Sequence, residues 1–477
     1  MSEAARATPQ QRRVLLVAIL ATFIAFLDGT VVTVALPAIA RDLGGSGDQA
    51  LVLQQWVVDA YLVTLGSLIL VAGSLSDVHG RRRVLAVGLV AFAVASAACA
   101  VAPTGAVLVA ARAVQGVGGA LLVPSSLAMI VSAFEGEAQG RAIGRWTAYT
   151  GIAGLIGPFV GGVLVDTLSW RWVFWITVPV AAVTLGLLRG VPDGTQRGGR
   201  RIDVRGAVLA AVGLAGTVSA LIESARLGWA DARVAVPLAL GVLGLVAFLV
   251  AERRASDPML PLRLFGERNF AWGNAATAAV YGALGFGGFI VTLFLQQVAG
   301  YPATAAGLAS LPVTLLMFGL SSRFGLLAGR HGPRLFMTVG PIVAAVGYLL
   351  MLTTDSTAVY WTQVLPGMVT FGLGLTMTVA PLTAAVLGAA PAADAGIASA
   401  VNNAVARVAG LVVVALAGVI VAGTLDVASF HSALLVTAGL LALGGLVSLV
   451  GITNAGRPTP AAAAAVTAQE SPAPPTV

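Results

Sequence analysis

The stretch Gly73-Ser-Leu-Ser-Asp77-Val-His-Gly80-Arg-Arg-Arg83 separates two long apolar runs, residues 52–72 and 84–102. We expect it to be a short loop between two membrane helices, because glycines permit tight turns and close helix approach. A carboxylate would stand at the end of one helix, and three fixed positive charges begin the next. Two interpretations stay open: a charged connection that controls gating, or a basic loop that only sets membrane topology. The residues concerned are Gly73, Asp77, Gly80, Arg81, Arg82 and Arg83.

A second stretch, residues 325–334, repeats this order of residue types. Gly325-Leu-Leu-Ala-Gly-Arg330-His-Gly332-Pro-Arg334 again lies between two apolar runs, but Gly329 takes the place of the carboxylate. Unless the two similar stretches arose by chance, the chain consists of two similar halves, as many transporters do. Gating control would then rest mainly on the first copy.

The composition is that of a protein that crosses the membrane many times. Of the 477 residues, 58% are hydrophobic and only 10% are charged. The net charge of +7 could suggest nucleic acid binding, but every basic cluster is flanked by membrane segments, so it indicates topology instead. The single cysteine, Cys99, lies within an apolar run, so we expect no disulfide and no metal site.

Fourteen apolar runs are long enough to span a bilayer, which needs about 20 residues each. Their ranges are 14–36, 52–74, 84–102, 106–131, 146–166, 171–189, 206–223, 234–251, 270–296, 304–327, 335–353, 359–387, 399–423 and 431–452. Because the Gly–Arg stretch follows the second and the tenth run, we expect two six-helix bundles with two inserted helices. The predicted divisions are a tail at 1–13, a first bundle at 14–190, an inserted pair at 191–269, a second bundle at 270–453 and a disordered tail at 454–477.

Arginine placement predicts the orientation of these helices. All basic residues are arginine, and most lie in the tails and in alternate loops. Because cytoplasmic loops carry the excess of positive charge, both termini should be cytoplasmic, in a bacterial inner membrane. Arg12 and Arg13 precede a first span without a signal-peptide cleavage site.

Ionisable residues at membrane depth are costly and therefore candidates for function. Asp28 lies in the middle of the first span, and we favour a proton- or cation-binding carboxylate over a helix-packing residue. Asp59 lies nearer the end of the second span, where helix capping or contact with solvent is as plausible as proton binding.

Arg112 and Gln115 share one face of the fourth span, at the helical spacing i, i+3. A buried guanidinium cannot lose its charge and needs a carboxylate or carbonyl partner. Asp28 is one candidate, and an arginine beside a titratable aspartate would couple protonation to conformation. A purely structural ion pair is the alternative.

The fifth span carries closely spaced glycines around a proline. Such glycines permit close helix crossing, and a proline permits bending. We expect this span to form a moving interface, with simple packing as the alternative. The residues are Gly154, Gly157, Pro158, Gly161 and Gly162.

Other polar side chains at membrane depth are candidates for lining a substrate cavity. Asn402, Asn403 and Arg407 lie in the thirteenth span, where the asparagines could equally hold helices together by hydrogen bonds. Tyr149 and Gln115 complete this set.

These motifs resemble those of the major facilitator superfamily, in its branch of fourteen-span drug:proton antiporters. The stretch 73–83 is similar to the family's motif between helices 2 and 3, and Leu27-Asp28-x-Thr30 to its helix 1 motif. Arg112-x-x-Gln115-Gly116 resembles the helix 4 motif linked to proton transfer. Gly154-x-x-Gly157-Pro158-x-x-Gly161-Gly162 resembles the helix 5 motif associated with export. The resemblance covers nearly the whole chain apart from the tails.

The resemblance implies an all-α membrane protein that works by alternating access. It implies a proton-driven exporter of hydrophobic or cationic small molecules, monomeric and without a cofactor. An exporter of a lipid, or of a dedicated metabolite or antibiotic, would use the same scaffold, whereas an importer is disfavoured by the helix 5 motif. A sensor would need a soluble output domain, and an enzyme a catalytic cluster. The chain offers neither, with only three histidines and one cysteine.

Overall fold

The computed structural model describes residues 8–44, 48–134, 136–192, 203–255, 258–391, 394–422 and 425–454, and within these ranges it contains helices and no strand. The first part comprises α1 (Pro9–Leu43), α2 (Asp48–His79), α3 (Arg81–Ala100), α4 (Gly105–Ala133), α5 (Gly136–Thr167), α6 (Trp172–Trp175) and α7 (Thr177–Leu188). Then follow α8 (Val204–Leu227), α9 (Ala232–Arg254) and the short η2 (Leu262–Gly266). The last part comprises α10 (Arg268–Gln297), α11 (Ala303–Ala309), α12 (Leu311–His331), α13 (Pro333–Leu350), η3 (Met351–Thr353), η4 (Tyr360–Val364), α14 (Leu365–Gly388), α15 (Ala395–Ala415), α16 (Ala417–Val421) and α17 (Val427–Gly451).

Twelve helical segments of the described chain are long and apolar enough to cross a membrane. Two further apolar helices are shorter, Ile152–Thr167 and Trp172–Leu188, and they coincide with the fifth and sixth expected spans. The second of these is divided at Ile176 into α6 and α7. The protein is therefore an all-helical membrane protein with at least twelve candidate spans.

The stretch 73–83 is not the loop that we expected. Helix α2 continues to His79 and α3 begins at Arg81, so Gly80 alone connects them. Gly80 has a φ of 92°, a backbone conformation that other residues rarely adopt, which explains why the helix ends at this glycine. The prediction failed because polar residues within the last turns of a helix resemble a loop in sequence. The side chain of Asp77 lies outside the described residues.

The second copy has the same geometry, which supports the prediction of two similar halves. Helix α12 continues to His331, Gly332 has a φ of 92°, and α13 begins at Pro333. Two residues after each of these glycines, an arginine donates to a carbonyl at the end of the last helix of its half. Arg82 Nη2 lies 3.3 Å from the Arg189 carbonyl after α7, and Arg334 Nη2 lies 2.8 Å from the Leu449 carbonyl of α17.

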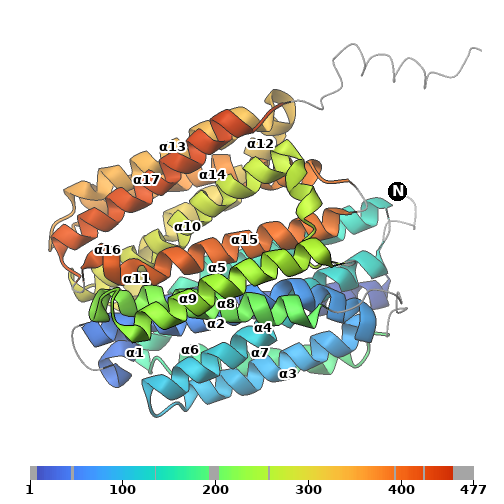
Figure 1. Cartoon of the computed structure of the whole chain (residues 1–477), viewed down its shortest axis with the longest axis horizontal. Helices are drawn as coiled ribbons and strands as arrows, with labels where there is room; N and C mark the ends of the chain where they lie inside the picture. The colour runs from blue at the N-terminus through green and yellow to red at the C-terminus, as the bar shows by residue number, and fades with distance from the viewer. Residues whose placement is uncertain are drawn as a thin grey trace, which may run out of the picture.

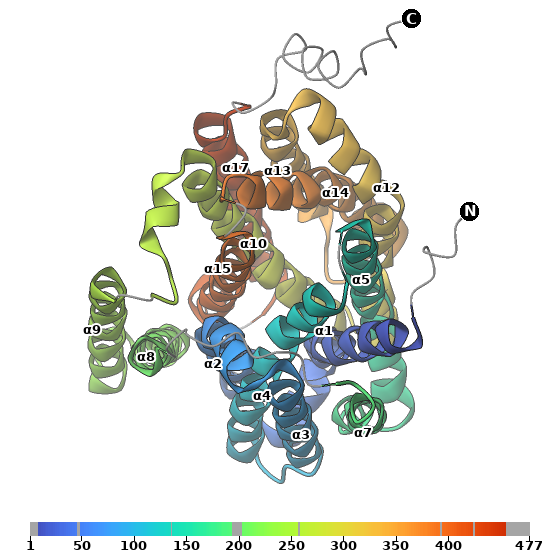
Figure 2. The same ribbon diagram turned by 90° about the vertical axis from the view of Figure 1, so that its right-hand side faces the viewer.

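The helices gather into two groups with an additional pair at their side. Viewed along the helices in Figure 2, α1–α4 and α7 lie in one group, and α10, α12–α14 and α17 in the other. Helix α8 contacts α2 of the first group and α15 of the second half of the chain, and α9 packs mainly against α8. The pair α8–α9 is therefore peripheral, as expected for inserted helices.

Small residues explain how α8 and α9 pack together. A side chain on Gly244 would lie 3.0 Å from Cα of Gly213, and one on Gly216 would lie 3.0 Å from Cα of Gly241. Glycines at these positions let the two backbones touch, which favours helix association in a bilayer. On its other sides α9 exposes large apolar side chains, among them Leu240 and Leu243.

Candidate functional site

A buried ion pair lies at the centre of the first group of helices. Arg112 Nη1 of α4 donates to Asp28 Oδ2 of α1 across 2.6 Å, and the two side chains are 2% and 0% exposed. Asp28 is near the middle of α1, about 28 Å along the helix from Pro9 at 1.5 Å per residue. Asp28, the candidate partner named from the sequence, thus pairs with Arg112 near the middle of the first candidate span.

Gln115 completes the hydrogen bonding around this pair. Its Nε2 donates to Asp28 Oδ1 at 2.8 Å and to Ser96 Oγ of α3 at 2.8 Å, while its Oε1 accepts from Arg112 Nη1 at 2.6 Å. Gln115, which we predicted among the residues that line a substrate cavity, is fully buried here and bonded to both members of the ion pair.

Arg112 is held by helix α2 as well. Its Nε donates to the Val57 carbonyl at 2.9 Å, and its guanidinium lies 4.4 Å from the centre of the Tyr61 ring. The site therefore joins α1, α2, α3 and α4. Loss of the charge on Asp28 would leave the Arg112 guanidinium without a counter-charge in a buried site, which is costly. Proton binding at Asp28 would consequently destabilise this arrangement of the four helices.

Asp59 lies well inside α2 and is fully buried, so it neither caps the helix nor meets solvent. Both of its carboxylate oxygens lack a hydrogen-bond partner, and so does Oε1 of Gln55, one helical turn away. A buried carboxylate without a partner is costly when charged. Asp59 is therefore a second carboxylate at membrane depth that a proton would stabilise.

The glycines of α5 bring this helix against α1 of the first half and α11 of the second half. A Cβ on Gly161 would lie 3.0 Å from Val31 of α1, and a Cβ on Gly162 would lie 2.6 Å from the backbone nitrogen of Thr304, at the start of α11. Gly157 faces Thr30, and the Pro158 carbonyl faces Gly307 of α11. In contrast, a Cβ on Gly154 would meet nothing within 4 Å.

Asp166, at the end of α5, closes the same contact. Its carboxylate accepts from the backbone nitrogens of Ala303 and Thr304 at 3.0 and 2.8 Å, and from Thr304 Oγ1 at 2.7 Å. A carboxylate at a helix N-terminus is favourable because the helix dipole is positive there. The carboxylate of one half thus caps a helix of the other half.

Two glutamines make the other hydrogen bonds between the halves. Gln296 Nε2 of α10 donates to the Val34 carbonyl of α1 at 3.0 Å, and Gln55 Nε2 donates to the carbonyls of Val414 and Ala415 of α15 at 3.0 and 2.9 Å. Helix α1 begins and α17 ends at one end of the molecule, on the right in Figure 1, which we call the terminal end. Among the described residues, every hydrogen bond between the halves lies toward the opposite end, the far end.

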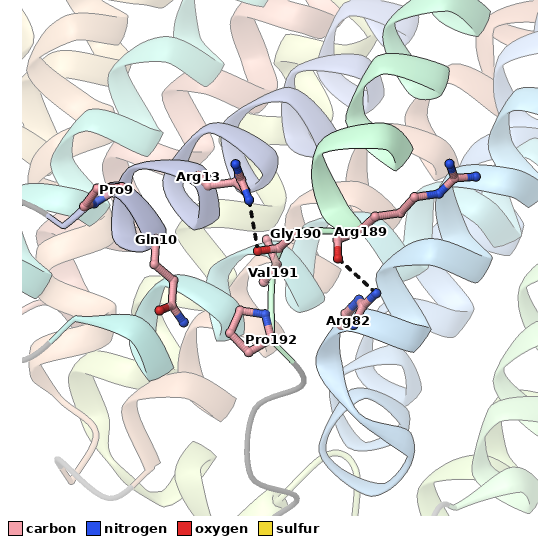
Figure 3. Close-up of a pocket in the computed structure, with 8 residues that line it drawn as sticks. All are labelled: Pro9, Gln10, Arg13, Arg82, Arg189, Gly190, Val191 and Pro192. Atoms are coloured by element: carbon pink, nitrogen blue, oxygen red, sulfur yellow. Dashed lines mark hydrogen bonds between the residues drawn. The ribbon is translucent and has the colours of Figure 1, made fainter.

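At the terminal end, Arg82 of the Gly–Arg stretch borders a basic pocket of about 440 Å³. Arg13, Arg82 and Arg189 line it, and Arg13 Nη1 donates to the Gly190 carbonyl at 3.3 Å (Figure 3). Arg82 thus ties the start of α3 to the end of α7, within one half. Arg81 and Arg83 start α3 beside it.

The remaining cavity candidates do not converge on one site. Asn402 donates to Asn274 Oδ1 at 3.1 Å and to Thr277 Oγ1 at 2.8 Å, so it joins α15 to α10. Asn403 donates to the Ser399 carbonyl of its own helix, and Tyr149 is 52% exposed. Arg407 lies 5.2 Å from the centre of the Phe26 ring, which places a cation of one half against α1 of the other.

Sequence reasoning missed Ser96, Tyr61 and Gln55 as parts of the site. The signal for Ser96 was weak, since one hydroxyl in an apolar run usually bonds to its own helix. Asp166 lies at the end of the glycine-rich span in the sequence. Nothing in the sequence indicated that its carboxylate would accept hydrogen bonds from the start of α11.

Comparison with known proteins agrees with this architecture. Residues 18–414 match the model of the family described as Major Facilitator Superfamily. Over 381 residues the chain is 36% identical to the multidrug resistance protein Stp of Mycobacterium tuberculosis, covering 78% of this chain and 69% of that protein. It is 38% identical to the puromycin resistance protein pur8 of Streptomyces alboniger, covering 76% and 72% of the two chains. It is also 38% identical to the cephamycin export protein CmcT of Amycolatopsis lactamdurans, covering 72% and 71%.

Solved structures show the same fold. The crystal structure of a D-xylose-proton symporter aligns with a TM-score of 0.69 at 17% identity, over 93% of this chain and 98% of that chain. A peptide transporter crystallised with sulfate aligns with a TM-score of 0.67 at 16% identity, over 92% and 94%. At these identities the likeness concerns the fold alone.

Proposed function

The chain belongs to the major facilitator superfamily, and we propose that it is a proton-coupled efflux transporter that exports hydrophobic or cationic small molecules. The relatives named above include multidrug resistance, puromycin resistance and cephamycin export proteins, which favours export as the direction of transport. The observation that carries the proton coupling is the buried Asp28–Arg112 pair in the middle of the first bundle.

Proton binding at Asp28 would change which arrangement of the helices is preferred. The neutral carboxyl no longer balances Arg112, so the ties that Arg112 and Gln115 make among α1–α4 weaken. Moving one charge through 100 mV provides about 2.3 kcal/mol, and reversing a two-state preference from 1:99 to 99:1 needs about 5.5 kcal/mol. Two protons, bound at Asp28 and Asp59, would provide about 4.6 kcal/mol at 100 mV, which is most of this amount.

We further propose that the far end faces the outside and that both termini are cytoplasmic, in an inner membrane. The arginines at the start of α3 and in the pocket of Figure 3 favour this orientation, because basic residues concentrate on the cytoplasmic side. The hydrogen bonds between the halves at the far end then close the outer side. With the two shorter apolar helices counted as crossings, the chain passes the membrane fourteen times, in two six-helix bundles and an inserted pair.

The side chains buried within the spans and the names of the relatives indicate what kind of compound is transported. Apart from the Asp28 network and Asp59, few charged side chains are buried within the spans, which favours a hydrophobic or weakly cationic compound. A lipid, or a dedicated metabolite or antibiotic, is the alternative cargo, and the names of the antibiotic resistance relatives favour an antibiotic among these. The bilayer, protons and the cargo are the partners that we propose, with the monomer as the working unit and no cofactor beyond the proton motive force.

The test uses purified protein in liposomes with an imposed pH gradient and a panel of lipophilic cationic dyes. Dye movement that depends on the gradient supports proton-coupled efflux. Folded protein that moves no dye, but moves a lipid probe or an antibiotic, would favour the alternative cargo. Dye movement that is independent of the gradient would refute proton coupling.

A further inference from the structure

Two carboxyl groups face each other at the terminal end of the inserted helices, away from the Asp28 site. Asp203 precedes α8, and Glu252 lies in the last turn of α9. A Cβ on Gly206 would lie 2.5 Å from Asp203 Oδ2 and 2.8 Å from Glu252 Oε1. The two oxygens therefore border the same small space, which is open only because residue 206 is a glycine.

The other oxygen of each carboxyl group is already used. Asp203 Oδ1 accepts from the Gly206 backbone nitrogen at 2.8 Å and so caps α8. Glu252 Oε2 accepts from the Leu260 backbone nitrogen at 2.8 Å, in the segment that leads to α10. These two bonds hold both groups in place and leave Oδ2 and Oε1 beside the space at Gly206.

Among the described residues, no arginine forms an ion pair with either carboxyl group. Glu252 is 2% exposed, and its Oε1 has no hydrogen-bond partner. The charged side chains of the adjoining segments are exposed, and none of them forms an ion pair with Glu252 within the ranges that the structure describes. They are Arg205 on α8, Arg253 and Arg254 on α9, and Arg263 on η2, which pairs with Asp394 at 2.8 Å.

We propose that Asp203 and Glu252 form a proton-binding site, in which one proton is shared between Asp203 Oδ2 and Glu252 Oε1. Two like charges that share a buried space cannot both stay ionised without a large cost, whereas one proton converts the repulsion into a hydrogen bond. The proton joins the start of α8 to the end of α9, while Glu252 Oε2 separately accepts from Leu260 in the segment before α10.

The consequence is a stability that depends on pH in a defined direction. The folded protein holds a proton that the unfolded chain releases at lower pH. The stability that this shared proton contributes is therefore fully present at low pH. It is lost as the pH rises past the pKa of the folded pair. An isolated, solvated aspartate and glutamate would produce no such loss at neutral pH or above.

The experiment measures thermal unfolding of the detergent-purified full chain from about pH 6 to about pH 9. We expect the midpoint of the wild type to fall as pH rises. Glu252→Gln, which keeps the shape and removes the charge, should hold the low-pH midpoint throughout. Asp203→Asn should do the same, because asparagine also caps a helix. A carboxyl stretching band in the infrared spectrum of the wild type, absent in Glu252→Gln, would identify the bound proton directly.

Asp231→Asn is the matched control, since Asp231 caps α9 at its other end but is paired with Arg233 at 2.9 Å. It should keep the pH dependence of the wild type. A Glu252→Gln profile that follows the wild type would overturn the proposal, and so would stabilisation that depends on sodium concentration instead of pH. If Glu252→Gln fails to fold, Asp203→Asn alone decides. The assay involves no transport, so its outcome is independent of the proposed efflux activity.

Discussion

Replacing Asp28 by asparagine tests the ion pair most directly. The substitution keeps the size of the side chain but removes the charge that lies 2.6 Å from Arg112 Nη1. It also places an amide where the carboxylate accepts from both Arg112 and Gln115, so one of these donors meets an N–H group. Removing one partner of a buried ion pair costs about 3–5 kcal/mol. We expect the free energy of unfolding to fall by this amount and gradient-driven efflux to be lost.

The assay combines denaturant titration in detergent micelles with transport in liposomes. The double variant Asp28→Asn/Arg112→Gln removes both charges and is the control, because replacing a buried pair as a whole is often nearly neutral. It should regain most of the stability lost in Asp28→Asn but none of the coupled transport. A loss in the double variant that equals the sum of the losses in Asp28→Asn and Arg112→Gln alone would show that the two charges do not interact. Coupled transport that persists in Asp28→Asn would refute the role of Asp28.

Three further predictions concern the second carboxylate and the far end. Asp59→Asn should leave the unfolding free energy unchanged or raise it, because both carboxylate oxygens lack a partner; a loss of several kcal/mol in the same titration would reveal a partner. Gly162→Ala should lower transport and cost about 1–3 kcal/mol by overpacking against α11, whereas Gly154→Ala, whose Cβ meets nothing within 4 Å, should behave as wild type in both assays. Asp166→Asn should weaken the cap on α11, because the amide keeps only one of the two oxygens that accept from this helix. An impermeant thiol reagent should then label Thr304→Cys more readily. Unchanged labelling would mean that the cap does not hold the halves together.

The all-helical membrane fold could be predicted from the sequence, because membrane helices need long apolar runs that can be recognised without a structure. The Asp28–Arg112 pair was also predictable, since an arginine at membrane depth requires a partner and few carboxylates lie at that depth. The extent of the helices was not predictable. Polar residues 73–79 looked like a loop, whereas Gly80 alone ends α2.

The role of Gln115 and the isolation of Asp59 depend on distances between helices, which no sequence pattern reports. The same holds for Asp203 and Glu252, which are far apart in the chain and meet only because α8 and α9 pack by their glycines. The asparagines of α15 were left between two interpretations. Asn402 donates a hydrogen bond from α15 to α10, which is the helix-joining role that one interpretation gave to both asparagines. The hydrogen bond that Asn403 donates stays within its own helix.

The single-residue turns at Gly80 and Gly332 restrict how the protein can move. A connection of one residue has no length to spare, so α2 cannot slide along α3, nor α12 along α13, without breaking a helix. The arginine after each turn also fastens the second helix to the end of its half. Each hairpin must therefore rotate as a rigid unit, and bending has to occur where other helices are interrupted. These points are Ile176 between α6 and α7 in the first half, and Ser310 between α11 and α12 and Leu416 between α15 and α16 in the second half. The interruptions lie at different places in the two halves, so the halves, although built alike, would deform unequally during a transport cycle.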